Sequence, residues 1–127
     1  MMSLTRFAFA AFLLLASSLS QALTVAPYTP SALAAAQKAG EPLVLLFHAS
    51  WCPTCRAQDK AFDALKADPS LKVTLMEVDY DQEKALEKQM HVTAQSTLIV
   101  FHGATERSRS TGETDPAKLK ATLQSAI

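Results

Sequence analysis

Cysteine is scarce in this sequence: only Cys52 and Cys55 occur among 127 residues. Small secreted domains held together by disulfides contain many more cysteines. A bond between residues three positions apart closes a very short loop and stabilises a fold little. A structural zinc site needs four protein ligands, and the sequence has no second cysteine pair and no histidines at zinc-finger spacing. The two cysteines are therefore expected to form a reactive site rather than to stabilise the fold. A structural disulfide and a zinc site are the open alternatives.

An excess of charge is also absent, since 12 basic residues balance 12 acidic ones. Nothing in this balance favours binding to nucleic acid or to an anionic membrane surface. The sequence has no internal repeat, no linker and no low-complexity tract, and 49% of its residues are apolar. This composition excludes a disordered chain and predicts one globular domain without a nucleic-acid partner.

The sequence lacks an apolar run long enough to cross a membrane, which takes about 20 residues. The unbroken run at residues 7–16 follows Arg6 and precedes small residues at Ser20 and Ala22. This order is typical of a secretory signal peptide. We therefore expect residues 1–22 to be removed and residues 23–127 to form an exported domain, periplasmic or secreted, without stable membrane insertion. A retained membrane anchor is the alternative.

The pattern along the rest of the chain alternates strands with helices. Strands are expected at residues 23–28, 43–47, 73–80, 97–101 and 106–110, and helices at 30–38, 53–66, 82–90 and from 116 onward. This order predicts an α/β fold with a central mixed sheet of four to five strands, flanked by about four helices. The inward helix positions are expected to be Ala57, Ala61, Phe62, Leu65, Ala85, Leu86, Met90, Leu119, Leu123 and Ile127.

The two cysteines lie where a buried strand ends and a helix begins. Cys52 is expected at the N-cap of that helix, with Pro53 at its first turn. Free backbone N–H groups and the positive end of the helix dipole would then stabilise a Cys52 thiolate and lower its pKa below about 8.5. We therefore predict that Cys52 is the exposed attacking thiol and that Cys55, one turn into the helix, is less exposed and resolves the mixed disulfide.

The chain resembles the thioredoxin superfamily over nearly all of residues 23–127. The resemblance rests on the segment from Phe47 to Cys55, on residues 78–81, on residues 96–101 and on the turn glycines Gly103 and Gly112. It implies the thioredoxin fold and a mixed-disulfide mechanism with no cofactor beyond the redox-active disulfide Cys52–Cys55. It also implies protein disulfide substrates, an upstream thiol electron donor and action as a monomer. Among exported members, the chain is similar to periplasmic domains that pass electrons to other proteins.

Several residues around the motif are expected to shape the site. Trp51 is expected to shield the disulfide and contact partners, and Pro53 and Thr54 separate the cysteines. Where the family has a cis-proline, this chain has Ser96. The Gln95–Ser96 bond is therefore expected to be either cis and strained, or trans with the loop in a different position. A cis bond at Gln95–Ser96 would cost about 3–4 kcal/mol.

Two further positions depart from the family. Leu46 replaces a buried acid that helps to deprotonate the resolving cysteine, and Glu77 on the neighbouring strand is a candidate substitute. His48 replaces an aromatic residue, and a protonated His48 would lower the pKa of Cys52 further.

The predicted function is thiol–disulfide exchange on exported proteins. The alternative is a non-catalytic module that uses the same fold to bind a partner or a metal. The residues Pro53 and Thr54 do not decide between a reductase and an oxidase, because the reduction potential depends on how strongly each redox form is stabilised.

Overall fold

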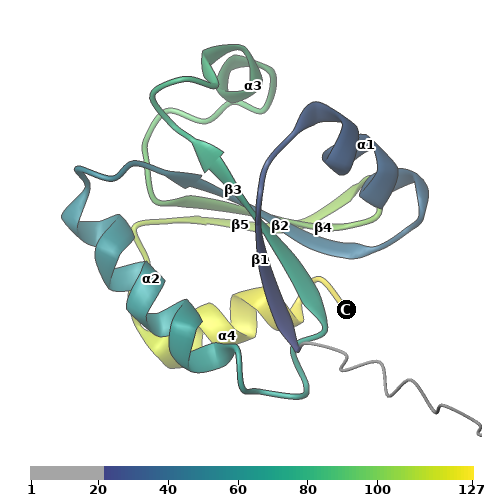
Figure 1. Ribbon diagram of the computed structural model, residues 1–127, viewed down its shortest axis with the longest axis vertical. Coiled ribbons are helices and arrows are strands. Elements are labelled where there is room, and N and C mark those ends of the chain that lie inside the picture. The colour runs from purple at the N-terminus through teal and green to yellow at the C-terminus, as the bar shows by residue number, and fades with distance from the viewer. Residues whose placement is uncertain (1–21) are drawn as a thin grey trace, which may run out of the picture.

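The computed structural model describes residues 22–127 (Figure 1). The predicted signal peptide, residues 1–22, lies outside this part except for Ala22. The strands are β1 (Leu23–Pro27), β2 (Pro42–His48), β3 (Val73–Asp79), β4 (Thr97–His102) and β5 (Thr105–Thr111). The helices are α1 (Pro30–Lys38), α2 (Pro53–Leu65), α3 (Lys84–Gln89) and α4 (Pro116–Gln124).

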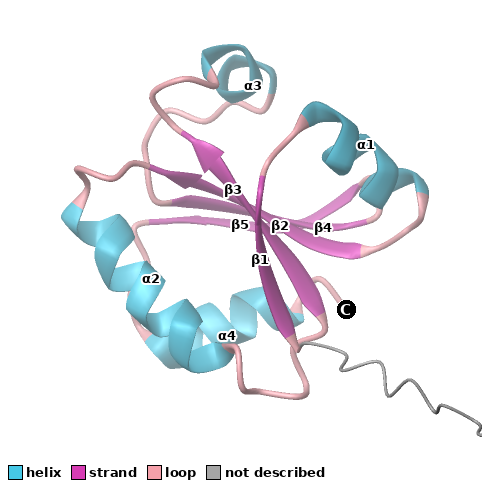
Figure 2. Ribbon diagram, in the orientation of Figure 1, coloured by secondary structure: helices cyan, strands magenta, loops and turns pink. Residues whose placement is uncertain are grey.

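The five strands form one mixed sheet in the order β1-β3-β2-β4-β5. Strand β3 pairs in parallel with both β1 and β2, whereas β4 pairs antiparallel with β2 and β5. Helices α1 and α3 lie on one side of the sheet, and α2 and α4 lie on the other (Figure 2). The predicted fold class, a thioredoxin fold with a mixed sheet and flanking helices, is confirmed.

Strand β2 lies in the middle of the sheet and is covered on both faces. Its residues Leu43, Leu45 and Phe47 pack with apolar residues of α1 and α3, while Val44 and Leu46 pack with α2 and α4. Because side chains alternate along a strand, a strand buried on both faces is apolar at successive positions. This explains the continuous apolar run in the sequence and places the end of β2 between two packed layers.

Three of the expected inward positions are wrong. On α2, Gln58 is fully buried and Ala57 is exposed, because Gln58 lies three residues after the buried Cys55 on the same face of the helix. On α3, Leu86 is buried beside Glu87 and Ala85 is exposed.

The third wrong position is at the end of the chain. Ile127 is 57% exposed and Ala126 is buried instead. Helix α4 ends at Gln124, so residues beyond it no longer follow the helical period.

Within residues 22–127, no helix has the length and apolar character that crossing a membrane requires.

Candidate active site

Cys52 occupies the N-cap of α2, as the sequence predicts. Its backbone is extended, at φ −86° and ψ 115°, and Pro53 follows at the first helical position. The backbone N–H of Cys55 donates a hydrogen bond to Cys52 Sγ over 3.2 Å. The first N–H groups of a helix have no partner within the helix, so the sulfur takes the place that a capping oxygen usually fills.

The Cys52 thiol is acidic for a cysteine. Burial raises its pKa, but hydrogen bonds from the side chains of Cys55 and Ser96 and from the backbone N–H groups of Cys55 and Thr54 lower it, to about 7. Hydrogen bonds to the charged form favour a thiolate. The lowered pKa increases the share of Cys52 that is a thiolate at neutral pH, and the thiolate is the nucleophile of disulfide exchange.

Cys55 differs from Cys52 in its ionisation. Burial raises the pKa of the Cys55 thiol, and the hydrogen bond with Cys52 raises it further. Both cysteines are free thiols here, and both residues are almost inaccessible, at 1% for Cys52 and 0% for Cys55. The expectation that Cys52 is exposed is therefore wrong. Ala49 and the partly buried Tyr80 pack around both cysteines, so burial does not distinguish the two thiols. They differ in pKa, which is lowered for Cys52 and raised for Cys55.

Ser96 contacts both sulfurs. Its hydroxyl lies 3.2 Å from Cys52 Sγ and 3.0 Å from Cys55 Sγ. No peptide bond in residues 22–127 is cis, so the Gln95–Ser96 bond is trans. Ser96 adopts a positive φ of 62°, and its backbone N–H donates to the carbonyl of Phe47 over 2.8 Å.

Gln58 holds the Ser96 loop from α2, a role that the sequence interpretation missed. Its Nε2 donates to the carbonyl of Ser96 over 3.2 Å and to the carbonyl of Glu113 over 2.9 Å. The residue is fully buried, so these two bonds fix the loop against the helix that carries both cysteines. The sequence feature that indicates this role is spacing along the helix. Gln58 is three residues from Cys55 and four from Phe62, which places all three on one face.

His48 and Glu77 meet as neighbours on β2 and β3. Glu77 pairs in register with Leu46, the position that the prediction gave it. His48 Nε2 lies 2.9 Å from Asp59 Oδ2, and His48 Nδ1 lies 3.5 Å from Glu77 Oε1. Asp59 was not singled out from the sequence, although it follows Cys55 by one helical turn. His48 is not among the groups that lower the pKa of Cys52.

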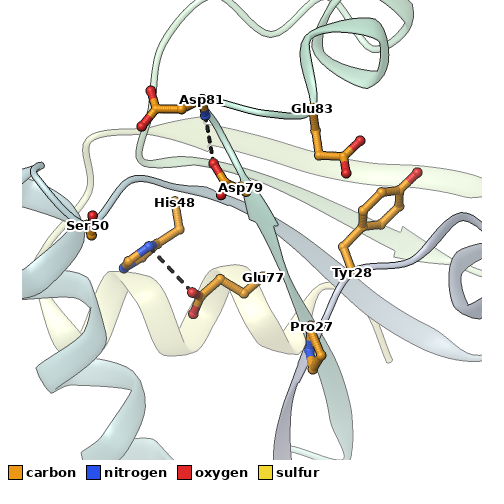
Figure 3. A pocket seen from close by; sticks show the side chains of 8 residues that line it. All are labelled: Pro27, Tyr28, His48, Ser50, Glu77, Asp79, Asp81 and Glu83. Atoms are coloured by element: carbon orange, nitrogen blue, oxygen red, sulfur yellow. Dashed lines mark hydrogen bonds and ion pairs between the residues drawn. The ribbon is translucent and has the colours of Figure 1, made fainter.

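Trp51 lies beside this region and is 54% exposed. Its indole N–H donates to Asp81 Oδ2 over 2.8 Å. Asp81, Ser50 and His48 are among the residues that line a cavity of about 380 Å³ next to the site (Figure 3). The predicted site residues thus form two groups, one around the sulfurs and one around His48.

A dithiol whose first sulfur caps a helix after a central strand of this sheet defines the class of thiol–disulfide oxidoreductases. The thioredoxin family profile matches residues 26–125. The chain belongs to the thioredoxin family, whose members act on protein disulfides and receive electrons from thiol donors. Its redox-active pair is Cys52 and Cys55.

Two relatives illustrate the similarity. A thioredoxin of Echinococcus granulosus is 37% identical over 75 residues, which cover 59% of this chain and 69% of that protein. The crystal structure of Trxlp from Edwardsiella tarda EIB202 superposes with a TM-score of 0.75 at 37% identity, covering 79% of this chain and 98% of that one.

A match to part of a larger protein also occurs. The chain is 30% identical over 64 residues to 5'-adenylylsulfate reductase 1 of Arabidopsis thaliana, covering 48% of this chain. It spans only 14% of the length of that reductase.

Proposed function

We propose that this protein reduces disulfides of exported proteins through Cys52 and Cys55. The observation that carries the proposal is the capped Cys52 sulfur, whose pKa of about 7 makes it nucleophilic at neutral pH beside a second thiol that stays protonated.

The reaction has two exchange steps. The Cys52 thiolate attacks one sulfur of a substrate disulfide, so that a Cys52–substrate bond forms, the substrate S–S bond breaks, and the departing sulfur takes up a proton from water. The Cys55 thiol then gives up its proton to the solvent, and the resulting thiolate attacks Cys52 Sγ. The Cys52–Cys55 disulfide forms as the bond between Cys52 and the substrate breaks, and the second substrate sulfur leaves as a thiolate. Two electrons pass to the substrate, and an external dithiol must return two electrons to the protein.

The reducing direction is inferred from the modest acidity of Cys52. A strongly stabilised thiolate favours the reduced form and makes a couple oxidising, as in disulfide-donating oxidases whose attacking thiol has a pKa of about 3.5. A pKa of about 7 gives the Cys52 thiolate little extra stability at neutral pH. Such a couple gives up electrons readily.

Export is the part of the proposal that rests on the N-terminal sequence alone. Residues 1–22 have the charged, apolar and small-residue regions of a signal peptide. Strand β1 begins at Leu23, so cleavage after Ala22 would leave every described helix and strand in the mature chain. Substrates would then be exported proteins.

Reduction of insulin by the purified protein, with dithiothreitol as the electron donor, tests the proposal. We expect the wild type to precipitate the insulin B chain, Cys52→Ser to be inactive, and Cys55→Ser to accumulate a mixed disulfide with insulin. Asp63→Asn, on the exposed face of the same helix, serves as a matched control and should behave as the wild type. Absence of turnover in the wild type, together with stable complexes that form without the cysteines, would favour the binding module instead.

A further inference from the structure

The cluster of His48, Asp59 and Glu77 brings together side chains from three elements. His48 ends β2, Asp59 lies on α2, and Glu77 belongs to β3. One nitrogen or oxygen atom from each residue lies within 4.8 Å of the corresponding atoms of the other two. Figure 3 shows the ring of His48 turned toward the carboxylate of Glu77.

The ring of His48 is placed between two carboxylates. Nε2 lies 2.9 Å from Asp59 Oδ2, and Nδ1 lies 3.5 Å from Glu77 Oε1. A neutral imidazole has a single N–H, so it donates to one carboxylate and points a lone pair at the other. A neutral ring therefore leaves one carboxylate facing a ring nitrogen that carries no proton, and a cation beside that nitrogen would satisfy both groups.

We propose that His48, Asp59 and Glu77 bind a divalent metal ion, with zinc as the best match. A neutral imidazole and two carboxylates carry a charge of −2, which one divalent ion neutralises. Imidazole nitrogen and carboxylate oxygen are both common zinc ligands, and three protein ligands leave a fourth position for water. This site contains neither cysteine and does not depend on the proposed redox function.

The surroundings of the cluster favour a cation. His48 and Glu77 line the cavity of about 380 Å³, and Asp59 and Glu77 line a second one of about 290 Å³, so Glu77 is common to both. Asp79, Asp81 and Glu83 also line the first cavity, and among the described residues no lysine or arginine does. This concentration of negative charge attracts cations.

The side chains can adjust to a metal ion. Zinc bonds are about 2.0–2.2 Å long, so the carboxylates must close in on the ring. The side chains of Asp59 and Glu77 are 42% and 44% exposed, which leaves them free to rotate, whereas that of His48 is 14% exposed and held in place. A bound ion would join the helix that carries the cysteines to β2 and β3.

Calorimetric titration of the oxidised protein with Zn²⁺ tests the site, because the Cys52–Cys55 disulfide removes both thiolates as ligands. We expect one ion per chain and an increase in Tm with zinc. Glu77→Gln and His48→Gln should each weaken binding by about tenfold or more. Glu83→Gln, which removes an acidic group from the same cavity but not from the cluster, should weaken zinc binding much less than either cluster substitution.

Substitution of Co²⁺ provides a second readout. Cobalt bound by the cluster should give a visible absorption spectrum that is lost in Glu77→Gln, an exposed substitution that should not impair folding. Equal zinc affinity in the wild type and the two cluster variants would overturn the proposal. So would absence of binding, with nuclear magnetic resonance showing protons on both ring nitrogens of His48.

Discussion

At the residue scale, Ser96 is the main departure from the family pattern. Its hydroxyl lies within 3.2 Å of both sulfurs, and its contact with Cys52 lowers the pKa of that thiol. A proline at this position could not keep the φ of 62° or the N–H bond to Phe47, because its ring fixes φ near about −65° and it has no N–H. Ser96→Pro must therefore rebuild the loop and would change more than the hydroxyl.

Removing only the hydroxyl gives a cleaner prediction. We expect Ser96→Gly and Ser96→Ala to raise the pKa of Cys52 from about 7. A rise of one unit would lower the thiolate fraction at pH 7 several-fold. Thiolate absorbance in the ultraviolet, followed against pH, measures this change, and the alkylation rate of Cys52 at pH 7 should fall in parallel.

Ser110→Ala is the matched control, since the Ser110 hydroxyl is buried and has no hydrogen-bond partner within residues 22–127. Glycine adopts a positive φ without strain, so Ser96→Gly separates loss of the hydroxyl from backbone strain. An unchanged Cys52 pKa in both Ser96 variants would show that the hydroxyl does not set the acidity of the thiol.

At the element scale, α2 makes different contacts along its length. Its first turn presents N–H groups to Cys52, and Gln58 ties its middle to the Ser96 loop. Beyond its last turn, Asp68 forms an ion pair with Lys120 of α4, with 2.7 Å between Oδ2 and Nζ. The hydrogen bond from Lys120, aided by those from Ser70, lowers the pKa of Asp68 to about 2.

This ion pair predicts an acid-dependent stability. The folded pKa of Asp68 is below the unfolded value of about 3.9, so the contribution is fully present above that value and is lost as the pH falls toward 2. We expect Asp68→Asn to lower Tm at pH 7, with the difference from the wild type shrinking below about pH 4. Thermal unfolding followed by circular dichroism from pH 2 to pH 7 measures it.

Asp63→Asn is the control, because Asp63 pairs with Lys66 on the exposed surface of the same helix and such pairs contribute little. A constant difference in Tm between Asp68→Asn and the wild type at every pH would contradict the assignment to the charged carboxylate.

At the scale of the whole molecule, the site forms where the C-terminal ends of parallel strands meet a helix N-terminus. Strand β2 delivers His48 and the loop to Cys52, β3 delivers Glu77, and the turn before β4 brings Ser96 to the sulfurs. In open sheets of this kind, ligands bind beyond the C-terminal ends of the strands. The catalytic cysteines and the proposed metal site therefore lie at the same end of the sheet, where β2 and β3 end.

Export is a prediction for the whole chain. Expression of residues 1–127 in a secreting bacterial host should yield a protein whose N-terminus is Leu23, because Ser20 and Ala22 provide the small residues that signal peptidase accepts. Mass spectrometry of the periplasmic fraction measures the new N-terminus. A variant with Ala22→Asp should be processed poorly, and recovery of the full wild-type chain in membranes would contradict the prediction.

The sequence was sufficient for the fold and for the two cysteines, since both depend on local signals. Apolar runs, proline at the first turn of three helices and the spacing of Cys52 and Cys55 can all be read along the chain. The buried Gln58 was missed because the interpretation placed Ala57 on the inner face. A helix has several possible inner faces until its partner is known, and the face that is buried here contains both Cys55 and Gln58.

What the sequence by itself determined is the order of strands and helices and the N-cap position of Cys52, because hydrogen bonds and side-chain periodicity within a few residues decide them. Only the tertiary structure decided which groups surround the sulfurs and the ring of His48. Ser96 is 44 residues from Cys52, and Glu77 is 29 residues from His48. Contacts over such separations form when strands pair in a particular register and a helix packs at a particular angle, and no local pattern specifies either.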